Sequence, residues 1–232
     1  MSFSRIVQHI RNCKKEIYIW FRNDDVGYFN SEIYKLNNIF KSTPLYHATI
    51  PKLLDDVTIT LLNSNKLTHV FQHGYSHINY SNNDNCKSEY PKNREITIVI
   101  EEYLMGNQIL RNSFRDKFLD VFCPPWYNID EKFSCEIRKH IKAMSFFDDI
   151  CDDTIKCINP NIDIIDWKIS DEFAGELYVY NQIVKKLEVE NILGFILHHR
   201  TMGKKGFHFV KKLINNLKCL PNVRFLDVNN LL

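Results

Sequence analysis

Residues 17–27 read Ile-Tyr-Ile-Trp-Phe-Arg-Asn-Asp-Asp-Val-Gly, an apolar run rich in β-branched and aromatic residues that ends in a polar segment. Such a run, at residues 17–22, is typical of a buried strand. Similar runs follow along the chain, at residues 45–50, 67–72, 119–122, 143–147, 162–167, 192–197 and 223–228. We therefore predict seven or eight strands.

Helical patterns separate these apolar runs. They cover residues 31–41, 53–63, 94–111, 131–141, 176–189 and 206–217, and a short amphipathic segment precedes the first strand. This alternation predicts parallel strands joined by right-handed crossovers, in an open doubly wound sheet or a closed barrel. The glycine-rich phosphate turn of a nucleotide-binding open sheet is absent from the sequence. We therefore expect an α/β fold, a distorted or incomplete (β/α) barrel of mostly parallel strands, with residues 1–232 as a single domain.

Composition limits the classes of partner. The chain is 44% hydrophobic, which is enough for one sizeable core, and its net charge of +2 favours neither nucleic acid nor an anionic membrane surface. No run approaches the ~20 apolar residues of a membrane span, and the N-terminus lacks the features of a signal peptide. Seven cysteines without a CxxC pair make disulfides unexpected. We therefore expect a soluble cytoplasmic protein in a reducing compartment.

Polar residues that often carry chemistry fall at or just after the ends of the predicted strands. They are Asp24, Asp25, His73, His77, the Pro-Pro-Trp segment at 124–126, Asp166, Trp167, His198 and His199. The carboxyl ends of parallel strands meet on one face of a barrel, and this face carries the active site. The sequence therefore predicts that five separate segments converge.

His73 and His77 are four residues apart, a spacing that places both imidazoles on one side of a helical turn and lets them bind one ion. Such a pair alone is more often structural than metal-binding. An aspartate at a neighbouring strand end adds a third ligand, and three ligands with an open position are typical of a catalytic metal site.

Asp24 and Asp25 are adjacent, and adjacent strand residues point to opposite sides. One carboxylate can bind a metal while the other accepts a proton from water; the alternative is a turn that caps the next helix. His198 ends an apolar strand, where it can be a general acid toward an amine or a structural histidine. We expect a structural or supporting role for His199.

Taken in order, these segments resemble the polysaccharide deacetylase family, carbohydrate esterase family 4. That family has a distorted (β/α) barrel and removes acetyl groups from amino sugars with a divalent metal. Its Asp-Asp pair is similar to residues 24–25, which implies that Asp24 is the catalytic base and Asp25 a metal ligand. Its paired histidines match His73 and His77, which the resemblance makes the remaining ligands. Its Leu-His motif implies that His198 is the catalytic acid.

Two motifs of the family are matched less closely. The Arg-x-Pro-aromatic motif is met in part by residues 123–126, because Cys123 stands at the arginine position. The family's arginine pairs with the base, and strand alternation puts Arg22 on the same side as Asp24, so Arg22 is the candidate substitute. The Asp-x-x-Asp-Trp motif is similar to residues 163–167, and Asp166 is expected to support the site.

The sequence also suggests which residues surround the predicted site. Trp126, Tyr127 and Trp167 are expected to line the substrate site, with core packing as the alternative, and the resemblance makes the backbone N–H of Trp126 an oxyanion donor. Residues 79–93 are polar and rich in asparagine, which predicts a long surface loop. Its segment 87–89, Lys-Ser-Glu, could close over the site as a lid.

The expected function is metal-dependent hydrolysis of the N-acetyl group of an amino sugar, in cytoplasmic biosynthesis of surface polysaccharide. One divalent ion is the implied cofactor: zinc is expected, and an Asp-His-His site also accepts cobalt or nickel. The expected partner is a carbohydrate substrate. Two alternatives stay open, a deformylase of a lipid- or nucleotide-linked sugar and a non-catalytic carbohydrate-binding relative, which the missing motif arginine would favour.

Overall fold

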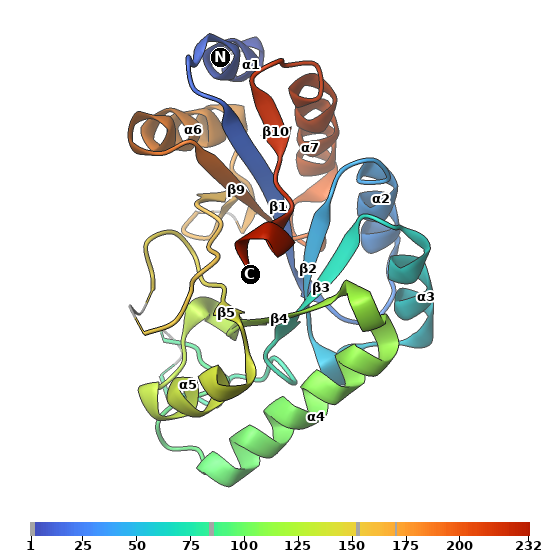
Figure 1. The fold of residues 1–232 in the computed structure, drawn as a ribbon, viewed down its shortest axis with the longest axis vertical. Helices are drawn as coiled ribbons and strands as arrows, with labels where there is room; N and C mark the ends of the chain where they lie inside the picture. The colour runs from blue at the N-terminus through green and yellow to red at the C-terminus, as the bar shows by residue number, and fades with distance from the viewer. Residues whose placement is uncertain (1–2, 84–85, 152–153, 170) are drawn as a thin grey trace.

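The computed structural model describes residues 3–83, 86–151, 154–169 and 171–232. Its centre is a curled parallel sheet in the order β5-β4-β3-β2-β1-β9-β6, with β10 beside the first part of β1 (Figure 1). The strands are β1 (Ile17–Val26), β2 (Leu45–Thr49), β3 (Thr68–His73), β4 (Phe118–Cys123), β5 (Ala143–Met144), β6 (Ile162–Asp163), β9 (Ile192–Leu197) and β10 (Val223–Phe225). The expected α/β fold, a distorted and incomplete (β/α) barrel, is confirmed.

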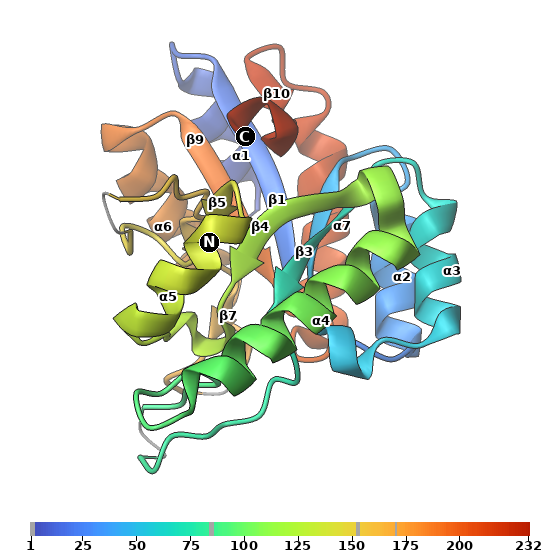
Figure 2. The ribbon, with the colours of Figure 1, turned by 60° about the horizontal axis from the view of Figure 1, so that its bottom comes forward.

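Helices pack around the outside of the curled sheet, as the two views show (Figure 1 and Figure 2). They are α1 (Ser4–Asn12), α2 (Ser31–Ile39), α3 (Asp56–Ser64), α4 (Ile96–Phe114), α5 (Glu131–Ile137), α6 (Glu176–Val189) and α7 (Gly203–Leu217). Side-chain caps fix several starts: the Asn30 side chain accepts the N–H of Ile33, and Asp55 accepts the N–H of Thr58. Within the described ranges, every helix is too short or too polar to cross a lipid bilayer.

Strand β1 is apolar on both faces because both faces are covered. Ile19 and Phe21 lie in the cluster that also contains buried residues of α1, α6 and α7. Trp20, between them, lies in a second cluster with Tyr46 and Phe71 of the neighbouring strands. A parallel strand buried on both faces reads as a continuous apolar run, which is the pattern at residues 17–21.

The predicted strand 162–167 is divided. Residues of β6 pair with β9, but β7 (Ile165–Asp166) pairs antiparallel with β8 (Glu172–Phe173) outside the main sheet. The division follows from Asp163, whose Oδ1 accepts the N–H of Ile165 at 2.8 Å and turns the chain away from the sheet. The strand predicted at 223–228 is also shorter, since β10 ends at Phe225 and the chain enters a short 3₁₀ helix at Val228–Leu231.

The prediction that disulfides are absent is wrong for one pair of cysteines, because Cys151 and Cys157 form a disulfide. After β5 the chain turns back, and Cys157 forms a parallel bridge with Met144. The Asn159 side chain donates to the carbonyl of Asp148 at 2.9 Å and stabilises this return. The two thiols are therefore brought together by a local reversal of the chain, which a count of cysteine spacings does not reveal.

Candidate active site

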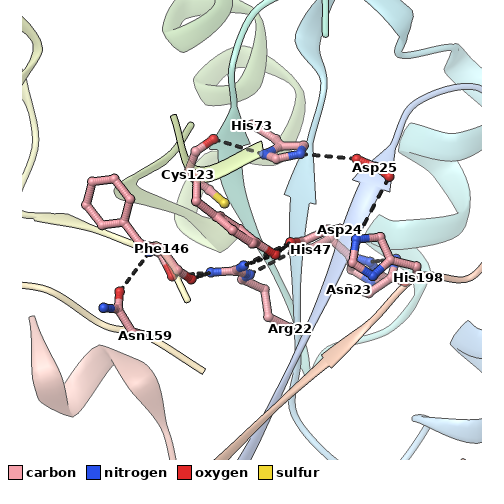
Figure 3. Close-up of polar contacts among 12 residues, drawn as sticks. Arg22, Asn23, Asp24, Asp25, His47, His73, Cys123, Phe146, Asn159 and His198 are labelled. Carbon is pink, nitrogen blue, oxygen red and sulfur yellow. Dashed lines mark hydrogen bonds and ion pairs between the residues drawn. The ribbon is translucent and has the colours of Figure 1, made fainter. Parts of the chain in front are cut away.

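Polar side chains from three strands lie together at the carboxyl ends of β1, β3 and β9 (Figure 3). Asp25 is at the centre: its Oδ1 lies 3.1 Å from Nε2 of His73 and 3.1 Å from Nε2 of His77. Nε2 of His198 lies 4.0 Å from Asp25 Oδ2. The structure therefore brings together the side chains for which the sequence predicts metal binding and acid catalysis.

A bulge in β1 separates the two aspartates. The register with β2 shifts between Asn23 and Val26, where β1 holds one residue more than its neighbour. Asp25 has a φ of +62° at this point. A bulge re-aims the side chains next to it, so Asp24 contacts Arg22 while Asp25 contacts the histidines. The aspartates thus belong to the strand rather than following it, and their separation comes from the bulge as well as from alternation.

The segment from His73 to His77 is not the predicted helical turn. His73 ends β3, and the loop that follows has positive φ at Gly74 (+60°) and at His77 (+57°). The two imidazole rings nevertheless approach to 5.1 Å between centroids. The loop therefore places the two rings close together, as a helical turn would. Unlike a helical turn, the loop needs contacts from other segments to hold this conformation.

The lid prediction is also wrong for two of its residues. Ser88 and Glu89 are buried, with 2% and 0% of their surface exposed. Ser88 Oγ donates to the carbonyl of Asn128 at 2.9 Å, and Glu89 accepts the N–H of Ser76 at 2.7 Å. This part of the 79–93 loop therefore lies beneath the histidine loop and supports it.

The donor atoms around Asp25 fit a divalent cation. Nδ1 of His73 lies 2.9 Å from the Cys123 carbonyl, and because a carbonyl oxygen only accepts, this nitrogen carries the hydrogen. In the neutral ring, Nε2 then presents a lone pair to a carboxylate oxygen, so the contact requires a positive charge between the two atoms. Ligand atoms 2.0–2.2 Å from one ion lie about 3.0–3.5 Å apart, which agrees with both 3.1 Å separations.

In the metal-free protein that positive charge is a proton. Burial lowers the pKa of His73, but the interactions with Cys123 and Asp25 outweigh burial and raise it well above its usual value. Burial raises the pKa of Asp25, but the hydrogen bonds from His73 and His77 outweigh it and lower that pKa well below its usual value. A metal ion that binds here has to displace this proton, so its affinity falls as the pH falls.

Arg22 and Asp24 form a buried ion pair with two parallel hydrogen bonds. Arg22 Nε donates to Asp24 Oδ1 at 2.7 Å and Nη2 to Oδ2 at 2.8 Å. The remaining guanidinium hydrogens go to Ser145 Oγ, the Phe146 carbonyl and Tyr127 Oη, so every donor has a partner. Burial raises the pKa of Asp24, but the charge and hydrogen bonds of Arg22, together with the charges of His198 and His73, outweigh burial and lower it below its usual value. Asp24 is therefore ionised at neutral pH.

Asp163 is buried beside His198, although it is not among the site residues predicted from the sequence. Its Oδ2 accepts the indole N–H of Trp167 at 2.8 Å, and the Trp167 ring lies 4.7 Å from the His198 ring. Burial raises the pKa of Asp163. Asp166, chosen instead, accepts the N–H of Lys168 at 3.1 Å and is half-buried. Both aspartates belong to the Asp-x-x-Asp-Trp motif at residues 163–167, but only Asp163 is buried.

A chain of buried neutral groups lies under the aspartates. Asn23 Nδ2 lies 3.2 Å from Nδ1 of His47 and 3.2 Å from Nδ1 of His199, and Asn23 Oδ1 accepts the N–H of His199 at 3.1 Å. Burial lowers the pKa of each histidine to about 3, so both are neutral near pH 7. His199 therefore connects β9 to β1, as a structural role requires. His47 lies inside β2, and its sequence context carries no signal of this contact.

Trp126 and Tyr127 follow β4 with positive φ values of 54° and 55°. The Trp126 ring lies 4.4 Å from the His77 ring, and its backbone N–H has no hydrogen-bond partner among the described residues. Tyr127 Oη donates to Asp24 Oδ2 at 3.1 Å. Tyr127 is therefore a direct neighbour of the buried carboxylate and not only a surface for substrate.

A cavity of about 780 Å³ adjoins this cluster. Its aromatic lining consists of Tyr127, Phe147, Trp167 and Tyr178. Trp167 and Tyr178 are 48% and 41% exposed, so both rings are available to a ligand. The cavity also shares Asp163 with the site, which makes the two continuous.

This half-barrel is the fold of the family 4 carbohydrate esterases. The structure is similar to a family 4 acetyl xylan esterase from Clostridium thermocellum in complex with a cobalt ion (TM-score 0.59, 13% identity, covering 92% of this chain and 89% of that one). It is also similar to a family 4 carbohydrate esterase from Streptomyces lividans in complex with acetate (0.60, 10%, 92% and 94%) and to the peptidoglycan deacetylase PdaC from Bacillus subtilis (0.60, 10%, 95% and 91%). No protein-family model and no curated protein matches the sequence. At these identities the resemblance is confirmed for the fold.

Replacing Arg22 with Met should change the pKa of Asp24 from lowered to raised. Without the guanidinium, burial dominates and raises the pKa of Asp24 above its usual value. The wild-type carboxyl stabilises the fold above its unfolded pKa of about 3.9, and this stabilisation is lost as the pH falls through the lowered native pKa. In the variant the sign inverts, so the protein loses stability as the pH rises above about 3.9.

Carbon-detected NMR titration of Asp24 and urea unfolding at several pH values measure both effects. Leaving the buried carboxylate unpaired should cost about 3–5 kcal/mol near pH 7. Arg111→Met, which removes an exposed ion pair with Asp120, is the control and should cost about 1 kcal/mol or less. An Asp24 titration unchanged in the Arg22 variant would contradict this assignment.

Proposed function

We propose that this chain is a member of carbohydrate esterase family 4 and a metal-dependent N-deacetylase of an amino sugar. The observation that carries the proposal is the convergence of Asp25, His73 and His77 on one point, beside an ionised Asp24. The order of the motifs along the chain and the similarity of the fold also support it.

Asp25, His73 and His77 would hold the cation, with zinc expected and cobalt or nickel also suited to this ligand set. When bound, a divalent ion supplies polarisation of the acyl carbonyl and activation of water. No described acidic side chain besides Asp25 belongs to this ligand cluster. Asp24 is therefore left for a different task.

Asp24 would take the proton of the attacking water. Its two oxygens are held by Arg22 and Tyr127, so the carboxylate is oriented as well as charged. The N–H of Trp126, which has no hydrogen-bond partner among the described residues, would donate to the oxyanion that forms at the acyl group, a contact commonly worth ~10²–10³ in rate. His198 would protonate the leaving amine, which otherwise departs as a poor leaving group.

The Arg22–Asp24 pair also bears on the non-catalytic alternative. That reading rested on Cys123 in the motif's arginine position, and Arg22 supplies a guanidinium to the same carboxylate from β1. A protein that only binds carbohydrate has no need of a buried, oriented and ionised carboxylate beside a cation site. The pair therefore favours catalysis.

The aromatic cavity supports a carbohydrate substrate, because sugar rings stack their C–H faces on exposed aromatic rings. Trp167 reaches from the cavity to His198, so a ring stacked there would lie next to the leaving amine. A cytoplasmic precursor of surface polysaccharide, as the sequence suggested, remains our proposed source of the sugar. The acyl group is proposed to be acetyl, with formyl as the alternative outcome of the assay below.

Asp24→Asn should slow hydrolysis strongly and leave metal binding intact. The amide cannot accept the proton of water, and loss of general-base catalysis costs ~10²–10⁴ in rate. Asp116→Asn is the control, since Asp116 is exposed and belongs neither to the cavity lining nor to the cation site. Mass spectrometry of chitooligosaccharides, nucleotide-linked N-acetyl sugars and N-formyl analogues measures the reaction. Wild-type protein that holds metal yet leaves every one unchanged would refute the proposal.

Tyr178→Ala should raise KM for an acetylated oligosaccharide by about 2- to 10-fold, the equivalent of one aromatic stacking contact. Its ring lines the cavity but has no described contact with Asp24 or His198, so kcat should be unchanged. Tyr34→Ala, an exposed helical tyrosine that does not line this cavity, serves as the control. Equal KM values for both variants and wild type would show that the cavity does not bind the sugar.

A further inference from the structure

The carboxylate of Glu89 binds three consecutive backbone N–H groups of the loop that carries His77. Oε1 accepts the N–H of Ser76 at 2.7 Å, the N–H of Tyr75 at 3.1 Å and the Ser76 hydroxyl at 3.1 Å. Oε2 accepts the N–H of His77 at 3.1 Å. The side chain is fully buried, and every one of these contacts is to the histidine loop.

These contacts make the loop a concave site for one anion. Successive N–H groups that point to the same side attract a negative charge, and hydrogen bonds to an ionised acceptor are about twice as strong as neutral ones. Among the described residues Glu89 has no cationic side chain on its carboxylate, because Arg94 donates to its backbone carbonyl and pairs with Glu102. The backbone of the histidine loop therefore supplies the stabilisation of this buried charge.

Gly74 shows how closely the carboxylate fits. Its φ of +60° is a left-handed conformation that favours glycine. A Cβ added at this position would lie 2.0 Å from Glu89 Oε2 and 2.7 Å from Pro125 Cγ. Glycine is thus required both by the backbone of the loop and by the space that Glu89 occupies beneath it.

Glu89 is itself held in place on both sides. Ser88 Oγ donates to the Asn128 carbonyl at 2.9 Å and accepts the N–H of Tyr90 at 3.0 Å. The carbonyl of Tyr90 accepts the N–H of Asp130 at 3.0 Å. The carboxylate therefore belongs to a fixed segment, anchored to the chain just after Trp126 and Tyr127, rather than to a mobile lid.

We propose that Glu89 is a positioning residue that sets the backbone of His77 for metal binding; this inference rests on the proposed function. His77 has a φ of +57°, a conformation that costs a non-glycine residue of order 1–3 kcal/mol and persists only when the surroundings impose it. The N–H bonded to Glu89 belongs to that same residue, and its ring Nε2 lies 3.1 Å from Asp25. Glu89 thus holds the loop in its ligand geometry before a metal binds.

The test is the zinc affinity of Glu89→Gln, measured by competition with a chromophoric chelator. Glutamine has the same shape, but its NH₂ group cannot accept a backbone N–H, so at least one contact is lost. Groups that orient metal ligands usually change affinity by 10–100-fold, and we expect a loss of about that size. Excess zinc should restore hydrolytic activity, since no reacting group is altered. Glu95→Gln, an exposed glutamate without a side-chain cap contact, is the control and should bind zinc like wild type.

The outcomes separate this inference from the proposed function. Zinc affinity within about twofold of wild type in folded Glu89→Gln would overturn the role of Glu89 alone, whereas wild-type protein without zinc affinity would overturn the metal site as well. Hydrogen exchange of the metal-free wild type gives a test that needs no variant. The amides of Tyr75, Ser76 and His77 should be protected before zinc is added, and free exchange there would contradict a preformed loop.

Discussion

The structure depends on one electrostatic constraint: Nε2 of His73 and Oδ1 of Asp25, both acceptors, lie 3.1 Å apart and need a positive charge between them. The Cys123 carbonyl imposes this constraint because it accepts a hydrogen bond from Nδ1 of His73, which therefore carries the only N–H of the neutral ring. Nε2 of His77 lies at the same distance from Asp25 Oδ1. In the metal-free protein a proton satisfies the contact, and the same atoms have the spacing of ligands around one divalent ion.

The backbone is distorted where it serves this arrangement. Asp25, His77, Trp126 and Tyr127 all have φ values between +54° and +62°. Each such residue costs of order 1–3 kcal/mol and is retained only where its surroundings dictate it. The surroundings here are specific: a bulge in β1 for Asp25 and the buried carboxylate of Glu89 for His77. Asp24 and Asp25, although adjacent, thereby acquire different partners, a guanidinium for the first and imidazoles for the second.

Much of the fold and part of the site could be predicted because they follow from local periodicity. Strand β9 and helix α6 have the predicted bounds, and the carboxyl ends of β1, β3 and β9 meet as parallel pairing requires. Alternation along β1 also anticipates the Arg22–Asp24 contact. The remainder depends on hydrogen bonds between distant segments. Glu89 lies in a polar loop with no periodicity, so the sequence pattern does not predict its contacts. Asp163 and Asp166 differ in burial, which the spacing of the motif does not predict either.

Anomalous diffraction from a crystal grown with zinc, collected on both sides of the zinc absorption edge, tests the central claim most directly. The account predicts a single strong peak within bonding distance of Asp25 Oδ1 and of Nε2 of both His73 and His77, with His73 Nδ1 still on the Cys123 carbonyl. A zinc peak elsewhere, or three side chains that point apart with no peak between them, would contradict it.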